Sequence, residues 1–180
     1  YAPGNDPSHR SVLRLTALHT DVSARATPAS LGVSSIALAS QPALAGIKHL
    51  NRLEQVLAAA ERQRMGVDEV VTCDQSGHPV AVASGNLFIR EGDRLLTPAL
   101  HDCGIAGTRR ALILDRWAGQ AGFDAGEQRL SLNDLESADE IFFCNSLIGV
   151  RPVKAFLKRR WLEYPAASAL QQVHLEALAP

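Results

Sequence analysis

The sequence predicts an α/β protein, more closely an α+β arrangement, in which short strands and a few helices enclose a core. Several short stretches alternate apolar and polar residues between turn residues, which is typical of strands. Longer stretches repeat apolar residues at helical spacing. The chain has 180 residues, 46% of them hydrophobic, which is enough for one well-buried domain or a large domain with a small appendage.

Eight segments have the pattern of strands, and turn residues such as Gly, Pro and Asp separate many of them. In chain order, the expected strands are residues 11–20, 31–39, 69–73, 80–84, 86–90, 94–97, 128–131 and 140–144. Short turns join the strands between residues 69 and 97, so we expect a meander there.

Four helices are expected between or after these strands. The first begins near Leu50, or already at Lys48, and ends at Gly66, because glycine suits the left-handed conformation after a helix. Its expected packed face consists of Leu50, Leu53, Val56, Leu57 and Ala60. The other helices are expected to run from residue 104 to about 121, over 134–137 with Asn133 as the cap, and over 165–178.

Composition and charge exclude several classes of function. The net charge is -1 and the pI is near 6.6, so the chain lacks the basic excess of a protein that binds nucleic-acid phosphates. The one basic cluster is interpreted as a solvated helix face and consists of Lys154, Lys158, Arg159 and Arg160. Three cysteines, far apart, favour buried thiols in a reducing compartment over disulfides or a metal site; they are Cys73, Cys103 and Cys144.

No apolar run approaches the ~18 residues of a membrane span, and no charged-then-apolar leader opens the chain. We therefore expect a cytoplasmic protein with no membrane or nucleic-acid partner. The opening residues 1–7 have the composition of a loop and begin with Tyr1 rather than Met, so we expect a fragment or a processed product.

Lys48 is the first candidate for chemistry. It lies where an extended segment ends and the first expected helix begins, and no carboxylate adjoins it in sequence. A free lysine amine has a pKa of about 10.4, but burial or a second cation lowers that pKa and permits Schiff-base chemistry. Arg52 is the candidate second cation, one helical turn away. The common alternative is a solvated lysine at a helix start.

Residues 104–110 are the second candidate, because they form a glycine-bearing entry to an expected helix. Such an entry exposes unpaired N–H groups and the positive end of the helix dipole, which together suit a phosphate. Other polar residues are given structural roles. His49 is interpreted as a helix-surface residue, and no catalytic role is assigned to the adjacent residues His101, Asp102 and Cys103.

Three separated motifs also carry a family resemblance: LAGIKHLNRLE at 44–54, GIAGTRR at 104–110 and ADEIFFCNSLIGVRPV at 138–153. In this order they resemble the 4-amino-4-deoxychorismate lyase family, fold-type IV pyridoxal-phosphate (PLP) enzymes related to branched-chain and D-amino-acid aminotransferases. NLF at 86–88 and LLTP at 95–98 extend the resemblance to practically the whole chain.

The resemblance implies the C-terminal domain of the D-amino-acid aminotransferase-like fold, a mixed sheet or pseudo-barrel flanked by helices. Residues 1–10 would be the remnant of an inter-domain loop and residues 11–180 the PLP-binding domain, with the family's N-terminal domain absent from this chain. A homodimer is also implied.

The same resemblance implies the site residues. Lys48 would hold pyridoxal 5'-phosphate and act as the catalytic residue, and the amides of Ile105 and Ala106 would bind the cofactor phosphate. Asn145 and Ser146 are implied as further cofactor contacts. For Ser146, a turn hydroxyl bonded to its own backbone is the alternative.

The implied reaction converts a small-molecule substrate, 4-amino-4-deoxychorismate, to 4-aminobenzoate and pyruvate in folate biosynthesis. The alternatives are a D- or branched-chain amino-acid aminotransferase of the same fold and a catalytically silent truncated domain. One residue departs from the family: Ala81 stands where many members place a Glu opposite the pyridine nitrogen. This departure favours the lyase, because an elimination that forms an aromatic ring needs the cofactor's electron sink less.

Overall fold

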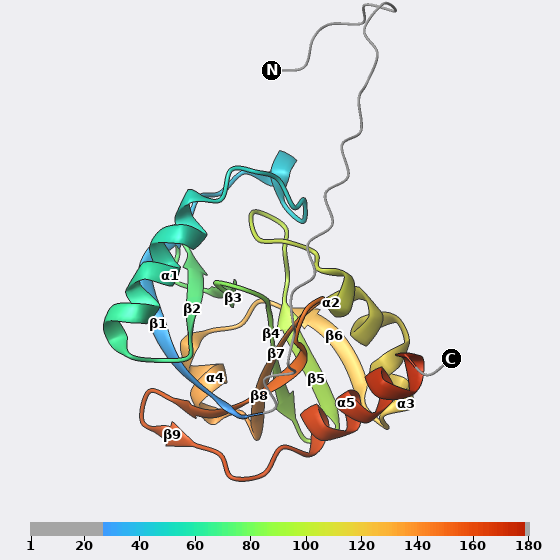
Figure 1. Cartoon of the computed structure of the whole chain (residues 1–180). Coiled ribbons are helices and arrows are strands. Elements are labelled where there is room, and N and C mark those ends of the chain that lie inside the picture. The colour runs from blue at the N-terminus through green and yellow to red at the C-terminus, as the bar shows by residue number, and fades with distance from the viewer. Residues whose placement is uncertain (1–26, 179–180) are drawn as a thin grey trace, which may run out of the picture.

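The expected strands and helices form a strongly curled mixed sheet with helices packed against it (Figure 1). The computed structural model describes residues 27–178, so the expected strand 11–20 and the loop 1–10 lie outside the described part. In chain order the described strands are β1 (Ala29–Leu38), β2 (Glu69–Asp74), β3 (Pro79–Val82), β4 (Asn86–Glu91), β5 (Arg94–Pro98), β6 (Asp124–Gln128), β7 (Glu140–Asn145), β8 (Gly149–Phe156) and β9 (Arg159–Arg160).

The strands form one mixed sheet. Their order is β3-β2-β1-β8-β7-β4-β5-β6, with β9 paired to β8. β1 is parallel to β2 and β8, whereas β7 is antiparallel to both β8 and β4. A bridge between Val82 and Gly85 forms the tight turn from β3 to β4. The sheet as a whole is strongly curled (Figure 1). The predicted fold class, a mixed sheet with flanking helices, is confirmed.

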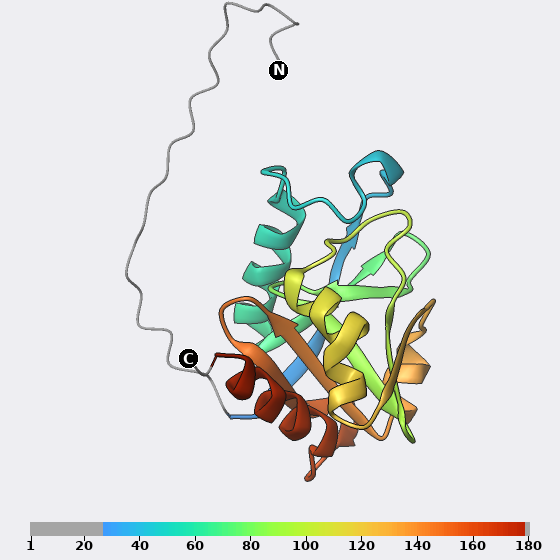
Figure 2. The same cartoon turned by 90° about the vertical axis from the view of Figure 1, so that its right-hand side faces the viewer.

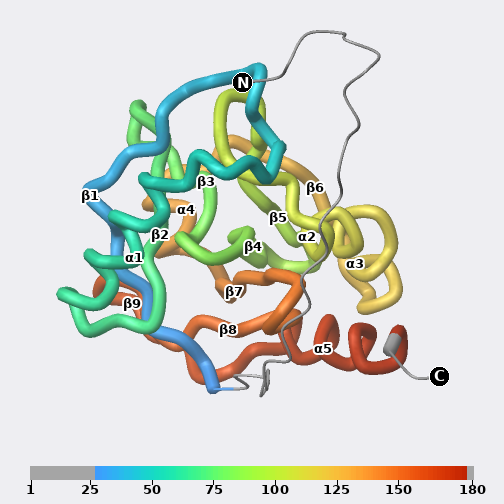
Figure 3. The backbone as a smooth tube through the Cα atoms, turned by 45° about the horizontal axis from the view of Figure 1, so that its top comes forward, coloured from blue at the N-terminus to red at the C-terminus, as the bar shows by residue number. Residues whose placement is uncertain are grey.

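Helices cover the sheet on two sides. They are η1 (Pro42–Leu44), α1 (Leu53–Met65), α2 (Thr108–Leu112), η2 (Ile113–Trp117), α3 (Ala118–Gln120), α4 (Leu132–Ser137) and α5 (Pro165–Leu178). The segments α2, η2 and α3 form one continuous helix with a π-helical turn in the middle, and this helix lies beside α5 (Figure 2). α1 lies on the other side of β4 from α2 (Figure 3).

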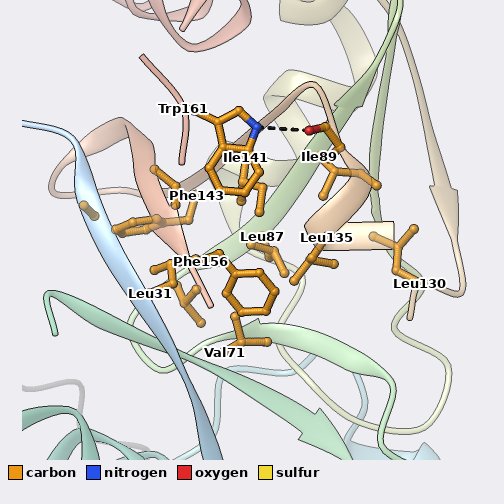
Figure 4. Packing of buried hydrophobic residues seen from close by; sticks show 14 of the residues in the cluster. Leu31, Val71, Leu87, Ile89, Leu130, Leu135, Ile141, Phe143, Phe156 and Trp161 are labelled. Carbon is orange, nitrogen blue, oxygen red and sulfur yellow. Dashed lines mark hydrogen bonds between the residues drawn. The ribbon is translucent and has the colours of Figure 1, made fainter. Parts of the chain in front are cut away.

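Alternation along the central strands divides the core into two parts. Leu87 and Ile89 of β4 point into the curl of the sheet, where they meet Phe143 and Phe156 (Figure 4). Phe88, between them, points outward and stacks on Phe142 with ring centroids 5.1 Å apart, under the helix pair α2–α3 and α5. Strands buried on both faces read as continuous apolar runs, which is why residues 140–144 were predicted correctly.

The first helix differs from its prediction. It begins at Leu53, not at Lys48 or Leu50, and ends as expected at Gly66 with φ of 66°. The apolar residues expected on its packed face are largely solvent-exposed in the described chain: Leu53 is 65% exposed and Val56 60%, and Leu50, which precedes the helix, is 100% exposed. The expectation of a packed apolar face is therefore wrong.

Carboxylates dock α1 on β1 instead. Glu61 accepts hydrogen bonds from the Ser34 hydroxyl, the Ser35 hydroxyl and, at 2.8 Å, the Ser35 amide. Glu54 accepts one from the Ala39 amide at 2.8 Å. The periodicity of apolar residues could not predict this arrangement, because it shows which residues share a helix face but not which residues that face contacts.

Three other expectations were wrong in part. The expected strand 128–131 is replaced by β6, a largely exposed edge strand whose residues lack a clear alternation. Ser131, not Asn133, caps α4 in a reciprocal arrangement with Asp134. The basic cluster expected on a helix lies on the β8–β9 hairpin, where all four side chains are exposed. No helix within residues 27–178 is long and apolar enough to cross a membrane.

Candidate functional site

Gly46 ties the lysine segment to the glycine element. Its amide donates to the carbonyl of Gly104 at 3.0 Å, and the amide of Ala106 donates to the carbonyl of Gly46 at 3.0 Å. Gly46 has φ of 79°, a conformation that glycine adopts without the strain other residues incur. This pairing holds the chain extended. Lys48, two residues further on, therefore lies before the helix and not in its first turn.

The glycine element forms the entry of the continuous helix that starts at Thr108. Gly104 has φ of 91°, and a Cβ there would lie 2.7 Å from atoms of Val80 and Leu100. At Gly107 a Cβ would lie 2.3 Å from Asn86 Oδ1. The Asn86 carboxamide in turn donates to the Ile105 carbonyl at 2.7 Å. These positions need glycine because the protein itself fills the space beside them.

The turn after β7 is organised by Asn145. Its Oδ1 accepts from the amides of Leu147 at 2.9 Å and Ile148 at 2.8 Å, and its Nδ2 donates to the Ser84 carbonyl at 3.0 Å. The Asn145 side chain is thus engaged with the protein and positions Ser146. The Ser146 side chain is exposed.

These three segments line one cavity of about 260 Å³, close to the lower end of the range for small-molecule sites. All five predicted site residues line it: Lys48, Ile105, Ala106, Asn145 and Ser146. Residues not predicted as site residues also line it, among them Arg52, Gln55, Thr72, Asn86, Thr108 and Arg109. Asn86 could have been singled out from the motif NLF, whereas Gln55 and Thr72 gave no separate signal.

Two details bear on the predicted phosphate contacts. The Ala106 amide already donates to Gly46, so a phosphate would compete with that hydrogen bond. The amides of Thr108 and Arg109 lie in the first turn of the helix, whose N–H groups have no partner within the helix. Sequence reasoning expected the helix from residue 104, whereas it begins at Thr108, and it could not assign individual amides.

The charge in this cavity is one-sided. Among the described residues, Lys48, Arg52 and Arg109 line it, and no Asp or Glu does. Within residues 27–178, none of these three cations forms an ion pair or a hydrogen bond with another side chain or carbonyl. Arg110, the next residue, differs: its guanidinium contacts Glu127 at 3.0 Å and donates to the Pro98 carbonyl at 3.0 Å. The cavity therefore favours an anionic ligand.

Partial burial of Arg52 and Arg109 strengthens this preference for an anionic ligand. Burial lowers the pKa of Arg52 from its usual value, because the charged guanidinium is partly removed from water. The Arg109 guanidinium lies 5.2 Å from the centre of the Trp117 ring, and its Nε is buried without a hydrogen-bond partner among the described residues. The Lys48 side chain is exposed, so the described residues do not supply the burial that the sequence analysis considered.

The other polar candidates lie elsewhere. His49 lines a neighbouring cavity with Cys103, and His101 and Asp102 line a third. Burial raises the pKa of the Cys103 thiol to about 11, which opposes a nucleophilic role. Within the described residues, no group of three or more His, Cys, Asp or Glu side chains could hold a metal ion.

The described domain thus combines a curled mixed sheet with a cationic cavity, lined by a lysine segment and a glycine-bearing helix entry, that suits a small anionic ligand. The family model for amino-transferase class IV matches residues 3–156. The chain belongs to the aminotransferase class IV family.

Relatives within this family include lyases and aminotransferases. Aminodeoxychorismate lyase from Vibrio harveyi is 40% identical over 123 residues, which are 68% of this chain and 45% of that protein. The solved 4-amino-4-deoxychorismate lyase from Pseudomonas aeruginosa is 38% identical, with a TM-score of 0.78 over 84% of this chain and 56% of that one. A putative branched-chain-amino-acid aminotransferase from Methanocaldococcus jannaschii is 33% identical over 59% of this chain and 37% of that protein. The resemblance predicted from the sequence is confirmed, and the chain spans about half the length of these relatives.

Proposed function

We propose that this chain binds pyridoxal 5'-phosphate and is the lysine-bearing part of an enzyme that converts 4-amino-4-deoxychorismate to 4-aminobenzoate and pyruvate. The observation that carries the proposal is the single cavity that joins Lys48, the helix entry at residues 104–108 and the Asn145–Ser146 turn. The relatives at 40% and 38% identity, both lyases by name, support the choice of reaction.

The cavity fits this cofactor on three counts. It offers an amine, a helix entry with free N–H groups and a hydroxyl, which are the donors that an aldehyde and a phosphate require. Its cations have no ion-pair partner among residues 27–178, and no carboxylate from these residues lines it. Arg109 Nε and Gln55 Oε1 are buried and lack hydrogen-bond partners among the described residues, so both have capacity for a ligand.

Individual residues would then take separate roles. Lys48 Nζ would hold the cofactor, while Thr108, Arg109 and Ile105 amides and the Ser146 hydroxyl would hold its phosphate. Bound pyridoxal phosphate supplies an electron sink next to the substrate amine. The freed Lys48 amine would take the proton from the amine-bearing ring carbon and give a proton to the departing enolpyruvyl group, which leaves as pyruvate.

Ala81 distinguishes the lyase from its main alternative. It lines the cavity, and no carboxylate there could keep a pyridine nitrogen protonated. A branched-chain or D-amino-acid aminotransferase depends more on that protonation than an elimination that forms an aromatic ring. The second alternative, a catalytically silent domain, follows from the coverage of about half of each relative.

Two assays separate these functions. Release of 4-aminobenzoate from 4-amino-4-deoxychorismate, measured by fluorescence and lost in Lys48→Ala, is the result expected for a lyase. Turnover of a branched-chain or D-amino acid with 2-oxoglutarate, without 4-aminobenzoate release, would contradict it and assign an aminotransferase. Absence of both activities in a chain that binds the cofactor would assign the silent domain.

A homodimer in the cytoplasm is proposed with this function. Exposed apolar residues before and along α1 support an interface on that side: Ile47, Leu50, Leu53, Val56 and Leu57. Light scattering on the purified chain tests the dimer, and a monomer at micromolar concentration would contradict it.

A further inference from the structure

Arg52 occupies a position that is unfavourable for the helix it precedes. It is the N-cap residue of α1, and its side chain makes no capping hydrogen bond. Ser, Thr, Asp and Asn are preferred at this position because their side chains accept a hydrogen bond from the first turn. A cation there also faces the positive end of the helix dipole, and only Glu54 in the first turn offsets it. The local structure of α1 therefore gives no reason for an arginine.

The cavity gives a reason. The Arg52 side chain lines the cavity together with Gln55, and it forms no ion pair with a described carboxylate. Arg109 lies at the other helix entry, held over the Trp117 ring on the side of α2 and α5. Arg52 precedes α1 and Arg109 lies in the first turn of α2. These two helices lie on opposite sides of β4 (Figure 3).

Two separate cations suit two separate anionic groups. The first-turn amides of α2, Arg109 and Ser146 belong to the segments where the proposed function places the phosphate. Arg52 precedes a different helix, α1. A guanidinium that is partly desolvated and unpaired binds a planar carboxylate through two parallel hydrogen bonds.

We propose that Arg52 binds a carboxylate of the substrate and so selects a carboxylate-bearing ring over a neutral analogue. The inference rests on the proposed function, since it assigns the phosphate to the α2 side. It also predicts that Arg52 strengthens ligand binding but lowers the stability of α1, because arginine is a poor N-cap residue.

The test compares 4-aminobenzoate with its neutral analogue 4-aminobenzamide. Dissociation constants of both are measured by calorimetry on the chain with and without pyridoxal phosphate, in the wild type and in Arg52→Ser, Arg52→Lys and Arg116→Ser. Arg116 is exposed on η2 and does not line the cavity, so its replacement matches the change in net charge. The measurement without the cofactor still reports the carboxylate preference if pyridoxal phosphate fails to bind. Failure of pyridoxal phosphate to bind would contradict the proposed function but not this inference.

The expected result is a preference of about tenfold or more for 4-aminobenzoate, lost in Arg52→Ser, partly kept in Arg52→Lys and fully kept in Arg116→Ser. Arg52→Ser should also raise Tm by about 2–4 °C through better capping, which shows that the loss is not unfolding. An unchanged preference in Arg52→Ser, or an equal loss in Arg116→Ser, would overturn the proposal. So would an altered pH dependence of the bound cofactor's absorbance with the preference intact, which would assign Arg52 to the cofactor's ring oxygen.

Discussion

Gly107→Ala is the substitution that most directly tests how the cavity wall is built. Gly107 precedes α2 with φ of -69°, an ordinary conformation for alanine, so backbone strain is not the issue. The added Cβ would lie 2.3 Å from Asn86 Oδ1 and 3.5 Å from Asn86 Cγ. The Asn86 carboxamide must therefore move, and its hydrogen bond to the Ile105 carbonyl must break.

The size of the effect follows from these contacts. Losing the partner of a buried amide costs about 1–3 kcal/mol. Forcing a side chain into a packed site costs about 1–3 kcal/mol more. We expect Gly107→Ala to lower the free energy of unfolding by about 2–6 kcal/mol and Tm by about 4–24 °C. Gly119→Ala is the matched control, because nothing lies within 4 Å of the added Cβ, and alanine in this helix should stabilise by about 0.5–1 kcal/mol.

Chemical denaturation of the single variants and of Gly107→Ala combined with Asn86→Ala measures these energies. Removing the Asn86 carboxamide also removes the clash, so the two substitutions together should cost at least about 1 kcal/mol less than the sum of their separate costs. Cofactor binding, followed by absorbance, should weaken in Gly107→Ala. Wild-type stability and binding in Gly107→Ala, or strict additivity in the double variant, would refute this account of the wall.

Two further predictions concern stability. Hydrogen bonds, first from the Ser34 hydroxyl, lower the pKa of Glu61 below its usual 4.5, so Glu61 adds stability above pH 4.5 that is lost as the pH falls through the lower, folded-state pKa. Ser34→Ala should therefore make Tm less sensitive to acid between pH 7 and pH 3, and an unchanged acid sensitivity would contradict the role of Glu61. Phe156→Ala removes a fully buried ring and should destabilise by about 3–5 kcal/mol in urea unfolding, whereas Leu162→Ala, at a 91% exposed position, should change stability by less than about 0.5 kcal/mol. Equal effects of the two would contradict the assignment of the core.

The central strands and the end of α1 could be predicted from the sequence because their signals are local. The apolar run 140–144 is buried on both faces, and Gly66 ends α1 in the left-handed conformation that glycine favours. The three motifs that suggested a site also meet at one cavity. Sequence spacing alone could not show this, because residues 48, 105 and 146 are far apart along the chain.

Features that depend on distant partners were missed. Glu61 is buried only because Ser34 and Ser35 accompany it, and no periodic pattern signals such a contact. The start of α1 was misplaced because Gly46 pairs with Gly104, more than fifty residues away, and keeps the lysine segment extended. Arg52 was considered as a neighbour of Lys48 on a helix, whereas the structure places the two on the same cavity without a shared helix.

Covalent trapping of the cofactor tests the central claim most directly. The chain is incubated with pyridoxal phosphate, reduced with borohydride, digested and analysed by mass spectrometry, with Lys48→Ala as the control and Lys154, an exposed lysine of β8, as the internal reference. Stoichiometric label at Lys48, absent from the control, is the predicted result. Label spread over Lys154 and other surface lysines, or unchanged in Lys48→Ala, would contradict the claim that this cavity holds the cofactor on Lys48.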